Sequence, residues 1–169
     1  MSENQEIYFE VVRIKAFSFY IDEASVNLEK QVLIQFQHKT GYDSTNNIID
    51  LTLRTFYSYD PNAPTPDLLI DLHVQNMFFI PNLIQFRKED GKYDLPHNLI
   101  FSMVGISISH TRALLAQNTA GTLLQNNILP IANPVEVAKA FYPETFGNAS
   151  TNIIEHIAPK KRIKKKASE

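Results

Sequence analysis

The stretch LLIDLHVQNMFFI, residues 68–80, decides the fold of this chain of 169 residues. Its side chains alternate between two faces: one face carries Leu68, Ile70, Leu72 and Val74, and the other carries Leu69, Asp71, His73 and Gln75. Alternation with a period of two is the pattern of a β-strand that is buried on one face only. We therefore expect a sheet with one apolar face and a second face in contact with water.

Three earlier stretches predict strands of the same kind, at residues 7–21, 31–38 and 48–59. In the first of them the alternation changes phase near Val11–Val12, which indicates a β-bulge. Residues 39–47 are rich in turn formers and residues 60–67 contain three prolines, so neither segment is expected to continue a strand. Four strands joined by such connections favour an antiparallel meander.

A long helix is predicted after the sheet. Residues 82–96 form an irregular connection, and residues 97–121 then carry apolar side chains on more than one helical stripe, with small residues such as Gly105 between them. Gly121 suits the position after a helix end, because glycine readily adopts the left-handed backbone conformation found there. Such a helix is expected to be buried on several sides.

A second, short helix is predicted over residues 134–142. Asn133 can cap its first turn, Pro134 fits the first helical position, and the helix is expected to end before Pro143. The apolar linker at residues 122–132 is expected to lie on the apolar face of the sheet. The whole pattern predicts an α+β fold, a four-stranded antiparallel meander sheet followed by a long helix and a short C-terminal helix.

The chain is expected to form a single domain over residues 1–142, followed by an extension over residues 143–169 that we expect to be flexible. With no cysteine, the sequence has no disulfide, no thiol nucleophile and no cysteine-based zinc site. The polar start of the chain lacks the layout of a secretory signal, and the uncharged stretch at residues 95–111 is interrupted by serines and histidines. We expect a soluble, cytoplasmic protein.

The charge is unevenly distributed along the chain. Residues 1–159 hold ten basic and seventeen acidic residues, a formal charge of −7, whereas the tail Lys160–Lys166 holds six basic residues. The tail admits three interpretations: a solvated extension, a segment that binds nucleic acid or an acidic partner, and a nuclear import signal. The second makes a nucleic-acid- or RNA-associated binding protein the main alternative function.

Catalysis is poorly supported by the sequence. Residues 105–109, GISIS, lack the last glycine of a nucleophile elbow and lie inside a predicted helix. Asp71 and His73 share a strand face, and their pattern favours a hydrogen-bonded surface pair over a metal site, which would need a third ligand. The chain also lacks a glycine-rich phosphate loop. We expect no enzyme, no metal and no cofactor.

The order and spacing of these elements resemble the SecB family of tetrameric protein-export chaperones over about residues 7–142. The strand at 68–80 resembles the family's fourth strand, with its Val-Gln pair followed by an aromatic turn. Arg112, nine residues before Gly121-Thr122, resembles the Arg and the later Gly-Thr of the family's main helix. The Leu129-Pro130 pair and Asn133 resemble the family's Leu-Ala-Pro-Val-Asn segment before its last helix.

The resemblance implies a role in protein transport as an ATP-independent holdase chaperone. In that family, first strands pair between subunits into eight-stranded sheets, and long helices pack between two such dimers. The homotetramer holds unfolded preproteins in apolar grooves, without nucleotide or metal. The residues that the resemblance then suggests for client binding are Phe78, Phe79, Ile80, Leu83, Ile84, Phe86, Leu123, Leu124, Ile128 and Leu129.

The same resemblance implies the translocation ATPase SecA as a candidate partner, which acidic residues on the outer sheet face would contact. Here these would be Asp22, Glu23 and Asp71. The chain departs from the family in two ways: His73 stands where the fourth strand would carry a glutamate, and the tail is basic rather than acidic or neutral. A member that guards one dedicated client would tolerate both changes, so a dedicated client is the alternative to SecA.

Overall fold

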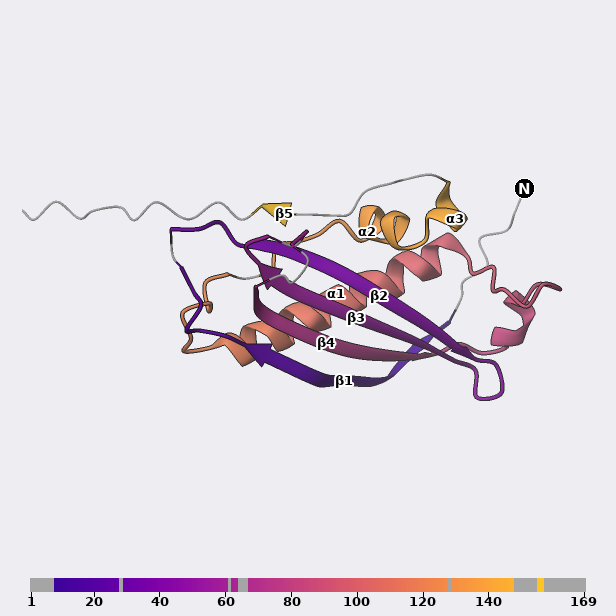
Figure 1. The fold of residues 1–169 in the computed structure, drawn as a ribbon. Helices are drawn as coiled ribbons and strands as arrows, with labels where there is room; N and C mark the ends of the chain where they lie inside the picture. The colour runs from indigo at the N-terminus through magenta and orange to yellow at the C-terminus, as the bar shows by residue number, and fades with distance from the viewer. Residues whose placement is uncertain are drawn as a thin grey trace, which may run out of the picture.

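The protein consists of an antiparallel sheet with a long helix packed along one of its faces (Figure 1). The computed structural model describes residues 8–27, 29–60, 62–63, 67–127, 129–147 and 155–156. The strands are β1 Glu10–Ile21, β2 Leu33–Asp43, β3 Ile48–Ser58, β4 Leu68–Phe79 and the two-residue β5 Glu155–His156. The expected α+β class and the four-stranded antiparallel sheet are confirmed.

The strands lie in the order β1-β4-β3-β2-β5, and every neighbouring pair is antiparallel. Strands β2, β3 and β4 follow one another as in the expected meander. The prediction of a meander was wrong for β1, which lies beside β4 and not beside β2. Strand β4 is buried along its whole inner face, from Ile70 to Phe78, and a strand in that position needs a neighbour on each side.

Strand β2 is longer than the sequence predicted. Residues 39–43, which we expected to turn, continue the ladder with β3 down to the pair Asp43–Ile48. The turn is confined to the next four residues, where the Asp43 carboxylate accepts hydrogen bonds from the amides of Thr45 (3.1 Å) and Asn46 (3.1 Å). Asn47 has a φ of 58°, a left-handed conformation that asparagine tolerates well.

Strand β1 contains two β-bulges. The register with β4 shifts between Val11 and Arg13, which confirms the predicted bulge, and again between Ala16 and Ser18, which the sequence did not reveal. Each shift inserts one residue, Val12 or Phe17, that has no partner in the ladder. As a result, β1 does not keep all of its apolar side chains on one face.

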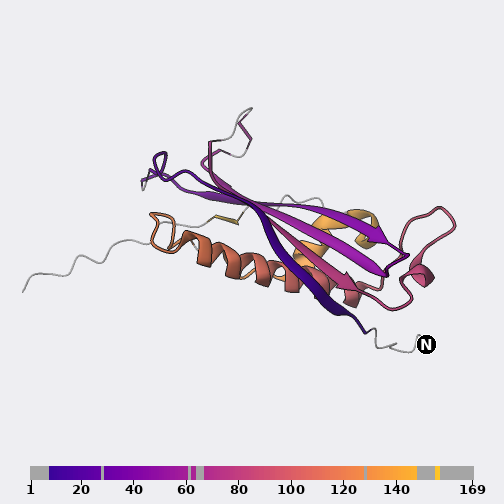
Figure 2. The ribbon, with the colours of Figure 1, turned by 90° about the horizontal axis from the view of Figure 1, so that it is seen from below.

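Helix α1, His97–Thr119, runs beneath one face of the sheet and leaves the other face uncovered (Figure 2). It ends close to Gly121, whose φ of 82° is left-handed, as predicted. By length and composition alone α1 could also cross a membrane: its mean hydropathy is 1.5 over a stretch that is 44% buried inside the protein. Here its buried side chains pack on the inner face of β3 and β4.

The short elements complete the layer that contains α1. A 3-10 turn, η1 Leu83–Phe86, lies in the connection between β4 and α1. Helix α2, Pro134–Phe141, begins as predicted, with Asn133 Oδ1 accepting a hydrogen bond from the Val135 amide at 3.0 Å. Helix α3, Pro143–Phe146, lies in the part of the chain to which the sequence assigned no fold.

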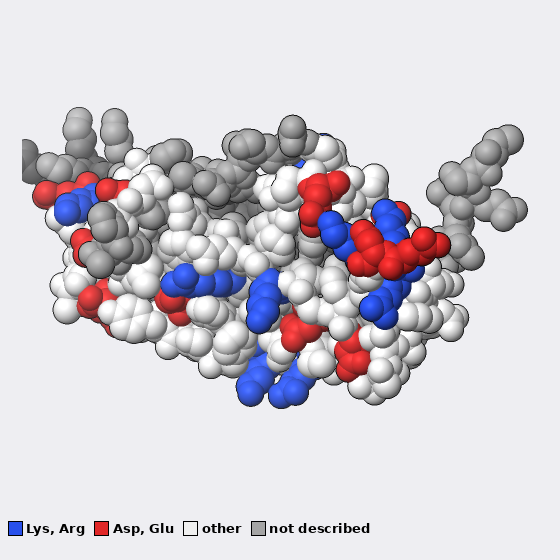
Figure 3. Space-filling view, turned by 45° about the vertical axis from the view of Figure 1, so that its right-hand side comes forward, with Lys and Arg blue, Asp and Glu red and all other residues white. Residues whose placement is uncertain are grey.

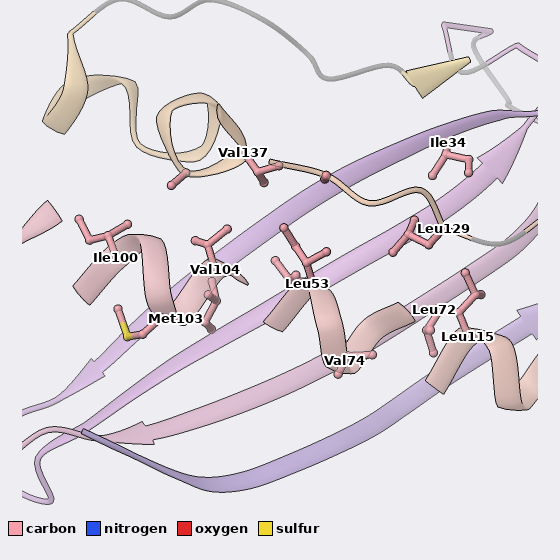
Figure 4. Close-up of a cluster of buried hydrophobic side chains, with 14 of the residues drawn as sticks. Ile34, Leu53, Leu72, Val74, Ile100, Met103, Val104, Leu115, Leu129 and Val137 are labelled. Atoms are coloured by element: carbon pink, nitrogen blue, oxygen red, sulfur yellow. The ribbon is translucent and has the colours of Figure 1, made fainter. Parts of the chain in front are cut away.

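The core lies between the sheet, α1 and the linker that leads to α2 (Figure 4). Leu53 and Val74 from the sheet meet Met103 and Val104 from α1, and Leu129 from the linker closes one end of the core. Leu124 and Leu129 of the linker are fully buried, so the expectation that this segment lies on the apolar face of the sheet is confirmed for them. Ile131, by contrast, is 83% exposed.

Candidate functional site

The largest concentration of exposed apolar side chains lies on β1. Four large residues of this strand are about half exposed: Val12 (49%), Ile14 (45%), Phe17 (52%) and Tyr20 (49%). Ile14 pairs with the buried Asn76 and belongs to the inner face, whereas Tyr20 pairs with Asp71 on the outer face. β1 is thus an edge strand that exposes apolar side chains on both faces, between polar residues such as Arg13 and Lys15 on the outer face, and within the described residues it pairs with β4 alone.

The solvent side of α1 is lined with small residues. Its exposed positions include Ser102, Ser109, Ala113 and Ala116, which share one helical face, and the exposed Ala120 follows directly after the end of the helix. Leu99, Met103 and Leu115 are buried on the opposite side. Small side chains allow another helix to approach closely, but here no other described element covers this face.

An open apolar groove of about 570 Å³ lies beside that face of the helix. Phe9, just before β1, borders it; Phe101 and Ile106 come from α1, and Pro134 comes from the start of α2. Gly105 forms part of its floor, where a Cβ would lie 3.2 Å from the Cβ of Pro134. This glycine therefore allows α1 and α2 to pack closely within one subunit.

His110 also borders the groove, and it is fixed to the sheet. Its Nδ1 lies 2.7 Å from Oδ1 of Asn76, a fully buried side chain on the inner face of β4. Because Asn76 Oδ1 is an acceptor, Nδ1 carries the proton and donates it. Desolvation lowers the pKa of His110, which favours this neutral form.

Half of the ten residues suggested for client binding are part of the core. Phe78, Ile80, Leu83, Leu124 and Leu129 are fully or almost fully buried. Phe79 and Phe86 are half-buried, Ile84 and Leu123 are more than half exposed, and Ile128 lies outside the described residues. The structure therefore does not bring the nine described residues of this set together on one surface, and of these nine only the four accessible ones can contact a client in this conformation.

The three candidate partner-binding carboxylates are each engaged in local contacts. Asp22 accepts hydrogen bonds from the amides of Ala24 and Ser25 and from the Ser25 hydroxyl; the Ser25 side-chain bond is the main reason that its pKa is lowered. Glu23 accepts a hydrogen bond from the Leu123 amide at 3.1 Å. Asp71 lies on the outer face of β4, where it forms a bidentate ion pair with Arg54.

His73 and Ser109, which were considered for metal binding and catalysis, each make a local contact. His73 Nε2 lies 3.2 Å from Asp71 Oδ1, the surface pair that the sequence favoured. The described residues contain no group of three potential metal ligands. In the GISIS segment Ser107 is buried, and the Ser109 hydroxyl donates to the Gly105 carbonyl within α1.

The sequence missed the exposed apolar face of β1, although a signal was present. The two alternating registers of the first strand place apolar residues on both faces, which is unusual for a sheet with one wet face. The second bulge, at Phe17, was not predicted from the sequence. Comparison of the chain with protein-family models and with curated proteins gave no match.

Proposed function

We propose that this protein is an ATP-independent holdase chaperone of the SecB type, which binds unfolded polypeptides during protein transport. The observation that supports this proposal best is strand β1, a twelve-residue sheet edge with apolar side chains exposed on both faces. An exposed, apolar edge strand is a template for pairing with another extended chain. The resemblance in element order, described above, points in the same direction.

Assembly would use β1 and α1 together. Pairing of the β1 strands of two copies would satisfy the free backbone groups of both edges and cover the apolar side chains between them. The small-residue face of α1 would then pack against a second such pair. In this proposal the protein is a homotetramer, built as a dimer of dimers.

Clients would bind to the apolar surfaces that assembly leaves open. These are the exposed side chains of Ile84, Leu123 and Ile131, together with the part of the groove at Phe101 and Ile106 that the packed α1 faces leave uncovered. Extended segments of unfolded proteins carry alternating apolar side chains, and such a surface would take them through burial of apolar area. The buried members of the predicted set would support this surface from below.

The proposed chaperone works in the cytoplasm and is not an enzyme. SecA remains a candidate partner, although Asp71 would have to exchange its contact with Arg54 for a contact with SecA. A single dedicated client is the alternative. The basic tail, on which the nucleic-acid-binding alternative depends, lies outside the described residues.

Two pairs of substitutions separate assembly from client binding. Val12→Lys with Ile14→Lys places two charges on the β1 edge and is expected to reduce the particle mass, measured by light scattering, from a tetramer to smaller species. Leu123→Lys with Ile131→Lys adds the same charge elsewhere and is expected to preserve the mass. Circular dichroism of both variants checks that each subunit folds.

The same variants are then tested as chaperones. Wild-type protein is expected to suppress the aggregation of dithiothreitol-reduced insulin without ATP, and the Leu123→Lys, Ile131→Lys variant is expected to do so less well. A monomeric wild-type protein at micromolar concentration, or one that leaves insulin aggregation unchanged, would refute the proposal.

A further inference from the structure

The sheet face opposite α1 contains a hollow of about 710 Å³, which we name the outer hollow. Its lining includes Lys15, Lys39, Arg54, Thr52, His73 and Gln75. Figure 3 shows Lys and Arg side chains gathered across the middle of this side of the molecule, with fewer carboxylates between them. The lining of the hollow therefore carries charged side chains, and the lining of the groove beside α1 does not.

The register of the sheet arranges the floor of the outer hollow in a row. Lys15 of β1 pairs with Gln75 of β4, Gln75 pairs with Thr52 of β3, and Thr52 pairs with Lys39 of β2. A lysine thus stands at each end of a row that crosses all four strands. Three strand spacings separate the two lysines, which is about 14 Å at the backbone.

The central side chains of the hollow bind one another. Arg54 donates to both carboxylate oxygens of Asp71, at 2.9 and 2.6 Å. The Asp50 carboxylate accepts from Gln75 Nε2 at 2.5 Å and from the Thr52 hydroxyl at 3.2 Å. The carboxylates here are therefore already paired or hydrogen-bonded. Lys15 and Lys39, in contrast, have no ion pair with any described residue.

The charge of the outer hollow is opposite to that of the surrounding chain. Residues 1–159 carry a formal charge of −7, yet the hollow holds three cations, at Lys15, Lys39 and Arg54, against two carboxylates, Asp50 in its lining and Asp71 in the ion pair with Arg54. Two of the three cations are free. A positive hollow in a negative body attracts an anionic ligand to one place on the surface.

We propose that the outer hollow binds an acidic, extended segment of a partner polypeptide. An extended chain advances about 3.4 Å per residue, so two carboxylates four residues apart span about 14 Å and point to the same side. One carboxylate would meet Lys15 and the other Lys39, while the chain crosses the strands above Gln75 and Thr52. The ring centroid of Phe17 lies 5.4 Å from that of His73, and Phe17 supplies an apolar contact at the margin of the outer hollow.

The number of free cations favours a short acidic peptide over a nucleic acid. Proteins that bind nucleic acid mainly through its phosphates commonly make about 6–10 phosphate contacts. The outer hollow offers two free lysines, and the hydrogen-bonded Asp50 carboxylate between them would oppose a continuous run of phosphates. This binding surface shares no residue with the groove beside α1, so it does not depend on the proposed chaperone function.

The test uses the full chain and a fluorescein-labelled nine-residue peptide of Thr, Val and Ser with Glu at positions 3 and 7. Binding is measured by fluorescence anisotropy at low and at physiological salt. The Lys15→Gln, Lys39→Gln double variant is compared with the wild type and with Lys139→Gln, a control that removes one positive charge from α2 on the other side of the sheet. A peptide with Gln in place of both Glu and an oligothymidylate of nine nucleotides are the other probes.

We expect the Glu peptide to bind more weakly as salt rises, and the double variant to lose about fivefold or more in affinity, since each exposed ion pair contributes modestly. Lys139→Gln should bind like the wild type. Equal affinity of the double variant, or equal affinity for the Gln peptide, would overturn the proposal. So would oligothymidylate binding that is tighter than peptide binding and lost in the double variant.

Discussion

At the scale of single residues, His38 shows how the sheet and the C-terminal helices are joined. Its ring, on the inner face of β2, stacks on Phe141 with centroids 4.2 Å apart and an interplanar angle of 17°. The neighbouring Thr40 hydroxyl lies 2.7 Å from the Tyr142 hydroxyl. Burial lowers the pKa of His38 because the charged form loses its hydration. The contact between β2 and α2 is therefore strongest with a neutral histidine.

This burial predicts a loss of stability in acid. The unfolded chain takes up a proton at His38 near its ordinary pKa of 6.5, whereas the folded protein does so only at lower pH. The free energy of unfolding should therefore fall as the pH drops from about 7 to 5. His38→Phe keeps the stacked rings and cannot titrate, so its free energy of unfolding should fall less over this range.

Urea unfolding of both proteins at pH 7, 6 and 5 measures this difference. Some pH dependence should remain in the variant, because burial also lowers the pKa of His110. An identical decrease in both proteins would show that His38 makes no contribution.

The positions of single side chains also explain which candidate client-binding residues were predicted correctly. Phe78 and Phe79 are adjacent in a strand and must face opposite sides, so a surface that included both was not consistent with alternation; Phe78 is in the core and Phe79 is half-buried on the outer side. In the linker, Leu123 is exposed and Leu124 is buried. That distinction depends on how the segment meets the sheet, and composition does not reveal it.

At the scale of elements, local sequence signals predicted where most helices and strands lie. They did not predict which strand pairs with β1. The cap at Asn133, the helix end near Gly121 and the bulge at Val11–Val12 each depend on a few neighbouring residues, and each was found. The neighbour of β1 depends instead on contacts with residues about sixty positions away. Successive strands usually lie side by side in a sheet, but this preference is weak. In the four-stranded sheet described here it fails for β1.

The capping contact of α2 can be tested directly. Asn133→Ala removes the acceptor for the Val135 amide and should lower the free energy of unfolding by about 1 kcal/mol. Asn133→Asp keeps an acceptor at the same position and should lower it much less. Denaturant unfolding at neutral pH compares the two variants, and equal stability of Asn133→Ala and the wild type would contradict the role of the cap.

The small-residue face of α1 allows a sharper test of assembly than Gly105 does. Gly105 packs on Pro134 of its own chain, so a larger side chain there would disturb the subunit itself rather than an interface between subunits. Ala113→Leu with Ala116→Leu changes exposed positions only. We expect this variant to keep its circular dichroism spectrum and to form smaller particles in sedimentation. A particle of unchanged mass would mean that this face is not an interface.

At the scale of the whole molecule, the surface is divided by chemistry. Apolar side chains are exposed along β1 and beside α1, whereas the outer hollow holds an excess of positively charged side chains. The groove beside α1 and the outer hollow therefore lie on opposite faces of the sheet. The sequence revealed the asymmetry between the acidic body and the basic tail, but the outer hollow combines residues from four strands and appears only when their register is known.

Deletion of residues 159–169 separates the chaperone from the nucleic-acid-binding alternative. We expect the shortened protein to suppress insulin aggregation as well as the full chain does, because the proposed client surface lies within residues 84–131. Retention of the full effect, measured by light scattering at equal molar ratios, is the expected result. Loss of all client binding on deletion would show that the tail is the binding element.

The place of β1 in the sheet determines when the chain can fold as it is synthesised. This strand is made first, but its neighbour ends at Phe79, so the segment between them must leave the ribosome before the two strands meet. At about 5–20 residues per second the delay amounts to several seconds. During that time a newly made subunit carries an unpaired apolar strand, and it is itself the kind of polypeptide that the assembled protein is proposed to shield.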